Sequence, residues 1–221
     1  MLLKLIFIIL IILFGKNSYE MHAFSKDSSI IKKDKLDNFT NKKIMNPIIS
    51  SIESEFNLLK YLDDNLLNYY ETNQKLIRLS DFYLFNDIYI HDSEKLYNDS
   101  NIDTHIIDSC FFNSFSYNIT HAMSIFKDDI YTNIIKNKNN IKIILVVHGS
   151  IDVNLYNPIH ENIINDNNKN KYNQKIKLEK NKDNFLFIPT NWHYDISSSD
   201  ISAFVTITSD TIFTYHYNLL R

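Results

Sequence analysis

The chain has 221 residues, of which 44% are hydrophobic, enough for one domain with a buried core plus appendages. Its formal net charge of −3 argues against nucleic-acid binding, which needs a basic surface. The single cysteine, Cys110, excludes an internal disulfide and the paired-cysteine spacings of metal sites, and its aromatic neighbours indicate a buried, inert thiol.

The amino terminus carries a short apolar run with the layout of a secretory signal. Residues 5–14 are apolar throughout, preceded by Lys4 and followed by a polar stretch. The run is shorter than the roughly 20 residues that a membrane-spanning helix needs. We therefore expect residues 1–18 to be a signal peptide or, because no cleavage site is convincing, an uncleaved signal-anchor. Either would place the rest of the chain in the endoplasmic reticulum lumen or the secretory pathway, with membrane contact only through this segment.

The next segment is polar and lysine-rich. Residues 19–46 show no sustained period, so we expect a flexible linker. Three triplets, which begin at Asn38, Asn98 and Asn118, have the form of N-glycosylation acceptors, although an asparagine-rich chain produces such triplets by chance.

An amphipathic helix is predicted at the start of the folded part, over residues 49–70. Apolar residues recur there at helical spacing, namely Ile52, Phe56, Leu59 and Leu62. Ser50 and Glu53 fit a capping box at its start. The one-sided apolar stripe favours packing against the rest of the domain.

Short strands are predicted from residue 82 to residue 208. Residues 82–90 are aromatic and β-branched, and residues 106–119 indicate one or two strands. Residues 141–147 are apolar enough for a buried strand, and residues 175–178 alternate like an exposed one. The low-complexity run at residues 162–173 is expected to be a disordered surface loop.

The most informative stretch is residues 185–207. Residues 185–188 predict a buried strand that Pro189 ends, because proline cannot donate to a ladder. A turn with the only tryptophan, Trp192, and His193 follows. In the next strand, from Ser202, alternate residues share a face: Ala203, Val205 and Ile207 on one side, Phe204 and Thr206 on the other. A polar aromatic corner between two strands is where a β-barrel would hold a ligand or metal.

This arrangement of strand, proline, tryptophan, histidine, polar loop and strand resembles the closing hairpin of the JmjC and cupin-like 2-oxoglutarate oxygenases. Residues 84–91 resemble the phrase that precedes the barrel in that family, so the resemblance covers roughly residues 84–208. It implies a mainly β fold, a double-stranded β-helix (cupin or jelly-roll) barrel with an N-terminal helical appendage. The domain would span residues 47–221, with its core at 82–208.

The resemblance also implies where an iron site would lie. The family holds Fe(II) with a His-x-Asp pair and a distal histidine. Asp129 takes the aspartate position, and Lys127 stands where the first histidine is expected. A protonated lysine has no lone pair for a metal and repels it. We expect Lys127 to pair with Asp129 inside the barrel and so to replace the charge of the metal.

The distal histidine position is ambiguous. Family spacing from Pro189 places it at Tyr194, whereas a corner shorter by one residue would place it at His193. At most one histidine and one aspartate of the metal triad therefore remain, and the vestigial metal candidates are Asp129, His193, Tyr194 and Lys127.

A 2-oxoglutarate-like pocket is implied by the same resemblance. Lys142 lies nine residues after Asn133 within an apolar strand, at the position whose lysine pairs with the distal carboxylate of 2-oxoglutarate in the family. The alternative is that Lys142 sits on the exposed face of a half-buried strand. The implied pocket residues are Lys142, Ser124, Asn133 and Trp192.

Three functions stay open at this point. The incomplete triad favours a catalytically impaired relative of the Fe(II)/2-oxoglutarate protein hydroxylases, acting in the secretory pathway as a binding module for an unknown luminal protein partner or a small molecule. The second is an active oxygenase that uses Fe(II) and 2-oxoglutarate with atypical ligation. The third is a structural luminal β-domain without a ligand. No catalytic residue and no cofactor is assigned.

Overall fold

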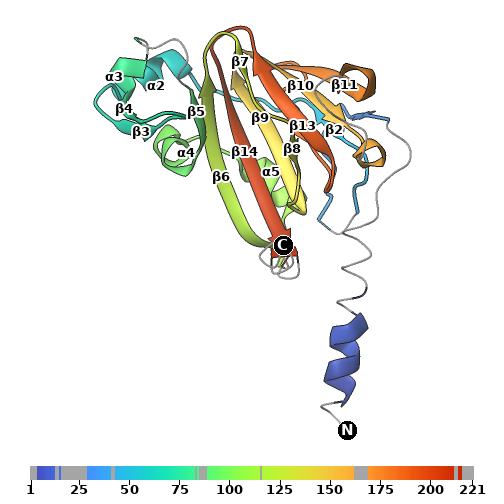
Figure 1. Cartoon of the computed structure of the whole chain (residues 1–221). Helices are drawn as coiled ribbons and strands as arrows, with labels where there is room; N and C mark the ends of the chain where they lie inside the picture. The colour runs from blue at the N-terminus through green and yellow to red at the C-terminus, as the bar shows by residue number, and fades with distance from the viewer. Residues whose placement is uncertain are drawn as a thin grey trace.

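Two β-sheets face each other and form a barrel, with a group of short helices beside it (Figure 1). This computed structural model describes residues 4–12, 15, 29–40, 43–82, 84, 89–114, 116–161, 169–211 and 214–215. The mainly β architecture predicted from the sequence is confirmed.

The larger sheet has seven strands in the order β1-β2-β12-β9-β14-β6-β5. Their bounds are Ile31–Lys32 (β1), Ile48–Ser50 (β2), Phe185–Phe187 (β12), Ile141–His148 (β9), Ser202–Thr211 (β14), Ser116–Phe126 (β6) and Ile90–Ser93 (β5). The predicted strands at 141–147, 185–188 and 202–208 are β9, β12 and β14. They lie side by side in this sheet because their near-continuous apolar runs suit burial on both faces.

The smaller sheet has the order β11-β10-β13-β7, and β8 also pairs with β13. The bounds are Asn173–Glu179 (β11), Ser150–Tyr156 (β10), His193–Ser198 (β13), Ile130–Tyr131 (β7) and Ile135–Lys136 (β8). The strands from β6 onward therefore form two facing four-stranded sets. One has the order β12-β9-β14-β6 in the larger sheet, and the other has the order β11-β10-β13-β7 in the smaller sheet. That order is the double-stranded β-helix.

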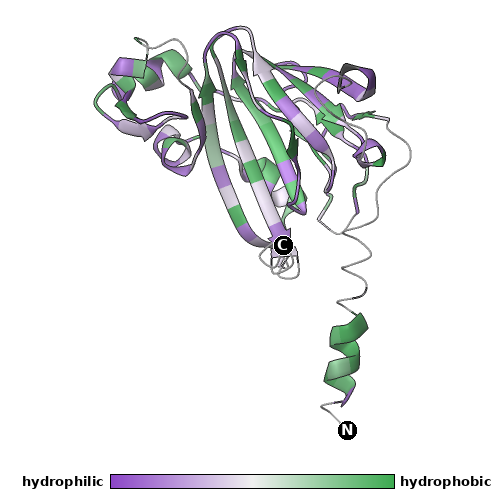
Figure 2. Cartoon of the chain, in the orientation of Figure 1, coloured by the Kyte–Doolittle hydropathy of each residue, from purple (hydrophilic) through white to green (hydrophobic). Residues whose placement is uncertain are grey.

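Alternation along the strands creates two cores. Phe204 of β14 and Ile196 of β13 belong to the inner core between the two sheets. Val205 and its neighbours at positions 203 and 207 belong to an outer core between the larger sheet and the helices. The facial pattern predicted for residues 202–208 is confirmed. Figure 2 shows the apolar residues concentrated along the central strands.

Short helices and a small hairpin cover the outer core. They are α2 (Leu58–Asp64), the hairpin of β3 (Tyr69–Glu71) and β4 (Leu76–Arg78), α3 (Leu79–Phe82), α4 (Glu94–Ser100) and α5 (His105–Phe111). The 3₁₀ turn η1 (Pro158–His160) and α6 (Lys169–Tyr172) lie elsewhere in the sequence, between β10 and β11. Residues 4–12 form an exposed helix. None of the helices that the structure describes is long and apolar enough to cross a membrane.

The predicted helix at residues 49–70 is wrong in its bounds. Ile49 pairs with Leu186 as part of β2, because an apolar segment beside an open sheet edge gains backbone pairing as well as burial. The helix begins only after Asn57, whose side chain accepts a hydrogen bond from the Lys60 amide at 3.2 Å. The capping box expected at Ser50 therefore does not form.

The expectation of a flexible linker over residues 19–46 is also wrong where the structure describes it. β1 pairs in parallel with β2, and Phe39 stacks on Phe111 with ring centroids 5.1 Å apart. The indole Nε1 of Trp192 donates to the carbonyl of Met45 at 3.2 Å. This segment is ordered because it closes the edge of the larger sheet.

Three other sequence predictions need correction or fall outside the described residues. Residues 106–111 are in α5 rather than a strand, and the strand begins only at Ser116. In 82–90 the chain is helical up to Phe82 and β5 begins at Ile90, whereas 83 and 85–88 lie outside the described residues. In 162–173, residues 162–168 also lie outside them, and the remainder forms α6 and the start of β11.

Gly149 makes the turn between β9 and β10, and Gly149→Ala should destabilise the domain. Its φ of +69° is in the left-handed region, and an added Cβ would lie 2.4 Å from the Ile201 carbonyl oxygen. The conformation alone costs a non-glycine residue about 1–2 kcal/mol, and the clash adds to that. Gly15→Ala is the control, because nothing lies within 4 Å of that position. Urea unfolding measures both variants, and equal stability of the two would contradict the turn geometry.

Candidate functional site

The inner face of the larger sheet becomes polar toward one end of the barrel. Cross-strand registers align three rows on β9, β14 and β6: Val146–Phe204–Ser124, Ile144–Thr206–Ala122 and Lys142–Thr208–Thr120. Phe204 and Val146 are in the inner core, so by the two-residue period the other rows face inward as well. The third row carries the charge, and the hydroxyls of Thr120 and Thr208 lie 2.6 Å apart within it.

The ammonium of Lys142 is buried and lies against an aromatic ring. The residue is 9% exposed, and its Nζ lies 5.5 Å from the centroid of the Tyr194 ring. Within the part of the chain that the structure describes, the Lys142 carbonyl accepts from the Ile188 amide at 2.8 Å, but no hydrogen bond or ion pair of the ammonium is found. An interior charge without a counterion is expensive, so an anion bound beside Lys142 would relieve that cost. Lys142 therefore lies on the inner face of β9 and not on an exposed face.

Tyr194 occupies the inward position of the corner, and His193 points outward. Tyr194 is 4% exposed and belongs to the inner core, opposite Leu155 of β10. His193 follows the other face of β13, where its Nε2 lies 3.9 Å from Glu161. Burial lowers the pKa of His193, and the Glu161 charge partly opposes this. Of the two alternatives left by the sequence, the structure therefore favours Tyr194 at the inner position.

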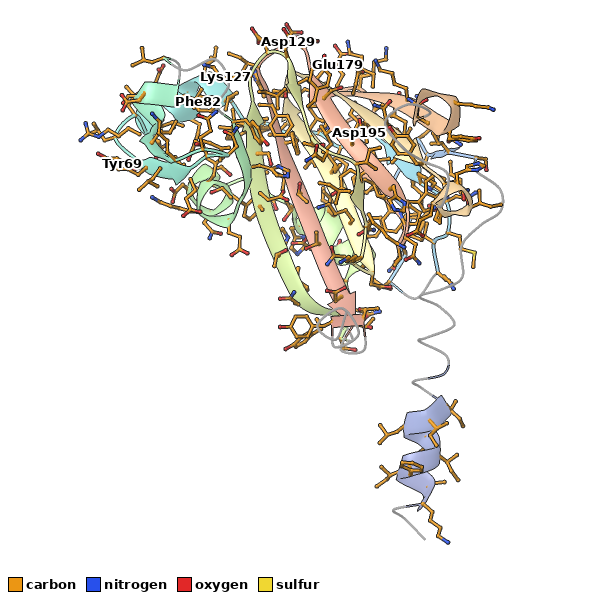
Figure 3. The ribbon with its side chains drawn as sticks, viewed as in Figure 1. Tyr69, Phe82, Lys127, Asp129, Glu179 and Asp195 are labelled. Carbon is orange, nitrogen blue, oxygen red and sulfur yellow. The ribbon has the colours of Figure 1, made fainter. Side chains whose placement is uncertain are left out.

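Lys127 and Asp129 lie at the opposite end of the barrel. The Lys127 ammonium donates to the Phe82 carbonyl at 2.9 Å and lies 5.2 Å from the centroid of the Phe82 ring. Asp129 is exposed, with a φ of 57°, in the turn between β6 and β7 (Figure 3). The expected Lys127–Asp129 pair inside the barrel is therefore wrong.

Strand pairing explains why these residues do not meet the others. Ile130, directly after Asp129, pairs with Ser198, whereas Ile135 pairs with Tyr194. Four residues of β13 separate the two points, roughly 13 Å at 3.3 Å per residue. Asp129 and His193 thus lie near different ends of β13, and neither faces the inner core.

Fe(II) does not fit the residues at the positions implied by the resemblance. Lys127 is bound to a carbonyl, Asp129 is exposed, and His193 faces away from the barrel interior. Among the described residues, no three His, Cys, Asp or Glu side chains are grouped so that they could hold a metal.

The remaining pocket candidates divide between the interior and the surface. Ser124 is fully buried on the inner face, where its Oγ accepts from the Asp92 amide at 2.9 Å. Trp192 is fully buried in the inner core. Asn133 is exposed between β7 and β8 and does not join them. Lys142, Ser124 and Trp192 are therefore interior residues, and Asn133 is not.

His91 is an interior residue that the sequence analysis missed. Its Nδ1 lies 3.1 Å from the Ser124 hydroxyl, and its ring lies 5.8 Å from that of Phe126 in the inner core. Burial lowers the pKa of His91, Asp92 raises it, and Lys142 lowers it further. The register shift in β5 that brings His91 inward has no signal in the sequence. Thr206 and Thr208, by contrast, follow from the alternation of β14.

The outer face of the smaller sheet carries a separate polar network. Asp195, labelled in Figure 3, accepts from the Tyr156 hydroxyl at 2.6 Å and from the Asn154 side chain at 2.7 Å. These bonds join β10 to β13 and fix their register, so the network has a structural role beside the interior site.

Comparisons with known proteins find only distant likenesses. No protein-family profile matches the sequence, and no curated protein matches it. Solved structures do match, and several of them are cupins. A cupin superfamily protein of Desulfitobacterium hafniense is 14% identical, with a TM-score of 0.32, over 42% of this chain and 67% of that one.

Two further cupin domains match at the same level. The Cnp3 cupin domain of Schizosaccharomyces pombe is 14% identical, with a TM-score of 0.33, over 49% of this chain and 61% of that one. The CENP-C cupin domain of Drosophila melanogaster is 13% identical, with a TM-score of 0.31, over 41% and 56%. The match thus spans less than two thirds of these two domains. The strand order of the two sheets shows by itself that the fold is cupin-like.

Acid should weaken the fold through its buried histidines. Burial lowers the pKa of His91, His148 and His193. Below about pH 6.5 the unfolded chain takes up protons that the folded chain does not, so the free energy of unfolding falls as the pH falls. His91→Gln should reduce this loss, and His105→Gln, at an exposed position, should not. Urea unfolding at about pH 7.5 and 5.5 tests this; a His91→Gln variant with the wild-type pH dependence would contradict it.

Proposed function

We propose that this cupin-like chain is a binding module whose barrel holds a small organic carboxylate at Lys142. The observation that supports it is the buried ammonium of Lys142, held against the Tyr194 ring without an ionic partner among the described residues. A carboxylate is the ligand that would both neutralise this charge and accept its hydrogen bonds. The protein would accordingly be a catalytically impaired relative of the Fe(II)/2-oxoglutarate protein hydroxylases.

Tyr194 determines how the proposed site holds the Lys142 ammonium. Its ring face attracts the ammonium and keeps it in the interior, an interaction worth about 0.5–2 kcal/mol. A tyrosine here takes the inward position that a metal-binding histidine would need. Binding at this site therefore depends on the lysine and not on iron.

The biological setting of this module is a second part of the proposal. The apolar run at residues 5–14 would carry the chain into the endoplasmic reticulum, with the barrel in the lumen. There the loaded or empty barrel would present its surface to a luminal protein partner.

Lys142→Met should abolish stabilisation by a small carboxylate. With 2-oxoglutarate or succinate present together with EDTA, the melting temperature of the wild type should rise, because a ligand that binds only the folded state stabilises it by RT ln(1 + [L]/Kd). The shift should vanish in Lys142→Met, which removes the charge but keeps a long apolar side chain. Lys177→Met, at an exposed position of β11, is the matched control and should keep the full shift.

Three results would contradict the proposal in different ways. An equal shift in Lys142→Met would place the ligand elsewhere. Tight, stoichiometric Fe(II) in the wild type, with carboxylate binding only in its presence, would favour the oxygenase. No shift with any carboxylate would favour a structural domain without a ligand.

The domain should be protected from protease in sealed microsomes. Full-length chain translated with microsomes should resist added protease until detergent opens the vesicles, because the domain would be luminal. Replacing Ile8 and Ile9 by Asp should abolish protection, because charged residues interrupt the apolar run. Digestion of the wild-type domain in intact vesicles would show that it is on the cytosolic side.

A further inference from the structure

The three Asn-x-Ser/Thr triplets lie in different structural surroundings. All three asparagines are exposed, so exposure does not distinguish them. What differs is the backbone that carries each triplet and the partner of its hydroxyl residue.

At Asn38 the triplet lies in an irregular connection, and its side chains engage each other. The Asn38 Oδ1 accepts from the Thr40 amide at 3.0 Å and from the Thr40 hydroxyl at 2.7 Å. These bonds use the carbonyl oxygen of the side-chain amide. For its Nδ2 no partner is found among the described residues, and Asn38 is exposed.

The residue between them anchors this connection to the domain. Phe39 is 7% exposed, stacks on Phe111, and donates a hydrogen bond from its backbone amide to the Cys110 carbonyl at 2.7 Å. The Asn113 side chain donates to the Thr40 carbonyl. Asn38 and Thr40 therefore flank a buried residue, Phe39, that packs against α5.

The other two triplets lie in a helix and at a bulge of a strand, and their hydroxyls bond to other partners. Asn98 lies within α4, and the Ser100 hydroxyl donates to the Tyr97 carbonyl at 2.7 Å. Asn118 lies in β6 at the register shift opposite β14, with a φ of 49°, and the Thr120 hydroxyl is bonded to Thr208. In neither triplet does the hydroxyl contact its own asparagine.

We propose that Asn38 is an N-glycosylation site and that Asn98 and Asn118 are not modified. The donor would be an oligosaccharide on a lipid pyrophosphate. The Asn38 Nδ2 forms a bond to the anomeric carbon of the first sugar, the bond from that carbon to the pyrophosphate oxygen breaks, the lipid pyrophosphate leaves, and the amide nitrogen loses one proton. This modification rests on the proposed luminal location of the domain, because the donor is found there.

The test is expression of the full chain in a eukaryotic secretory cell, followed by gel migration before and after peptide N-glycosidase. The wild type should show one glycosidase-sensitive shift, and mass spectrometry should find aspartate at position 38 after release. Asn38→Gln and Thr40→Ala should each lose the shift completely, and Thr40→Ser should keep it. Asn98→Gln and Asn118→Gln are the matched controls and should migrate like the wild type.

A second version carries a strong heterologous signal peptide before residue 19, which separates failure of translocation from failure of modification. A shift that appears only in this version would support Asn38 as an acceptor and overturn the luminal location of the natural chain. No shift in either version, or a shift that survives Asn38→Gln, would overturn the proposed site.

Discussion

The register of β13 decides which side chains enter the barrel. This strand pairs with β10 on one side and with β7 and β8 on the other, and the bonds from Tyr156 and Asn154 to Asp195 hold it there. A slip of one residue would exchange the two faces and bring His193 inward in place of Tyr194. Because the register is fixed, β13 presents the phenol ring of Tyr194 to the interior, beside the Lys142 ammonium, and not the imidazole of His193. The chemistry of the site follows from Tyr194, rather than His193, facing the interior.

Both lysines linked to the oxygenase resemblance have defined roles in this fold, and the roles differ. Burial of Lys142 costs the free energy of desolvating its ammonium. An apolar residue would pack more favourably at this position, so a structural role alone does not explain a lysine there. Lys127 instead fastens the helical appendage to the barrel through the Phe82 carbonyl. The position that would carry a metal ligand in an active enzyme therefore contributes to the joining of two parts of the structure.

Sequence patterns predicted the strands better than the site. β12 and β14 were predicted from apolar runs and alternation. The helix expected from residue 49 begins later, because Ile49 belongs to β2 and pairs with β12. The side on which Lys142 lies could not be predicted from alternation, because β9 is buried on both faces except at its last residue. The choice between His193 and Tyr194 needed the pairing of β13, and the place of Asp129 needed the turn after β6. Each depends on contacts between distant segments that one sequence does not encode locally.

The most direct test of a metal-independent carboxylate site is proton NMR of Lys142 and Tyr194, with EDTA throughout. The account predicts cross-relaxation between the Lys142 ε-methylene protons and the Tyr194 ring, with an upfield shift of the methylene resonance, since the ammonium lies over the ring face. Both sets of resonances should move together as succinate is added. Methylene protons of Lys142 that contact no aromatic ring, or resonances that move only after Fe(II) is supplied, would contradict it.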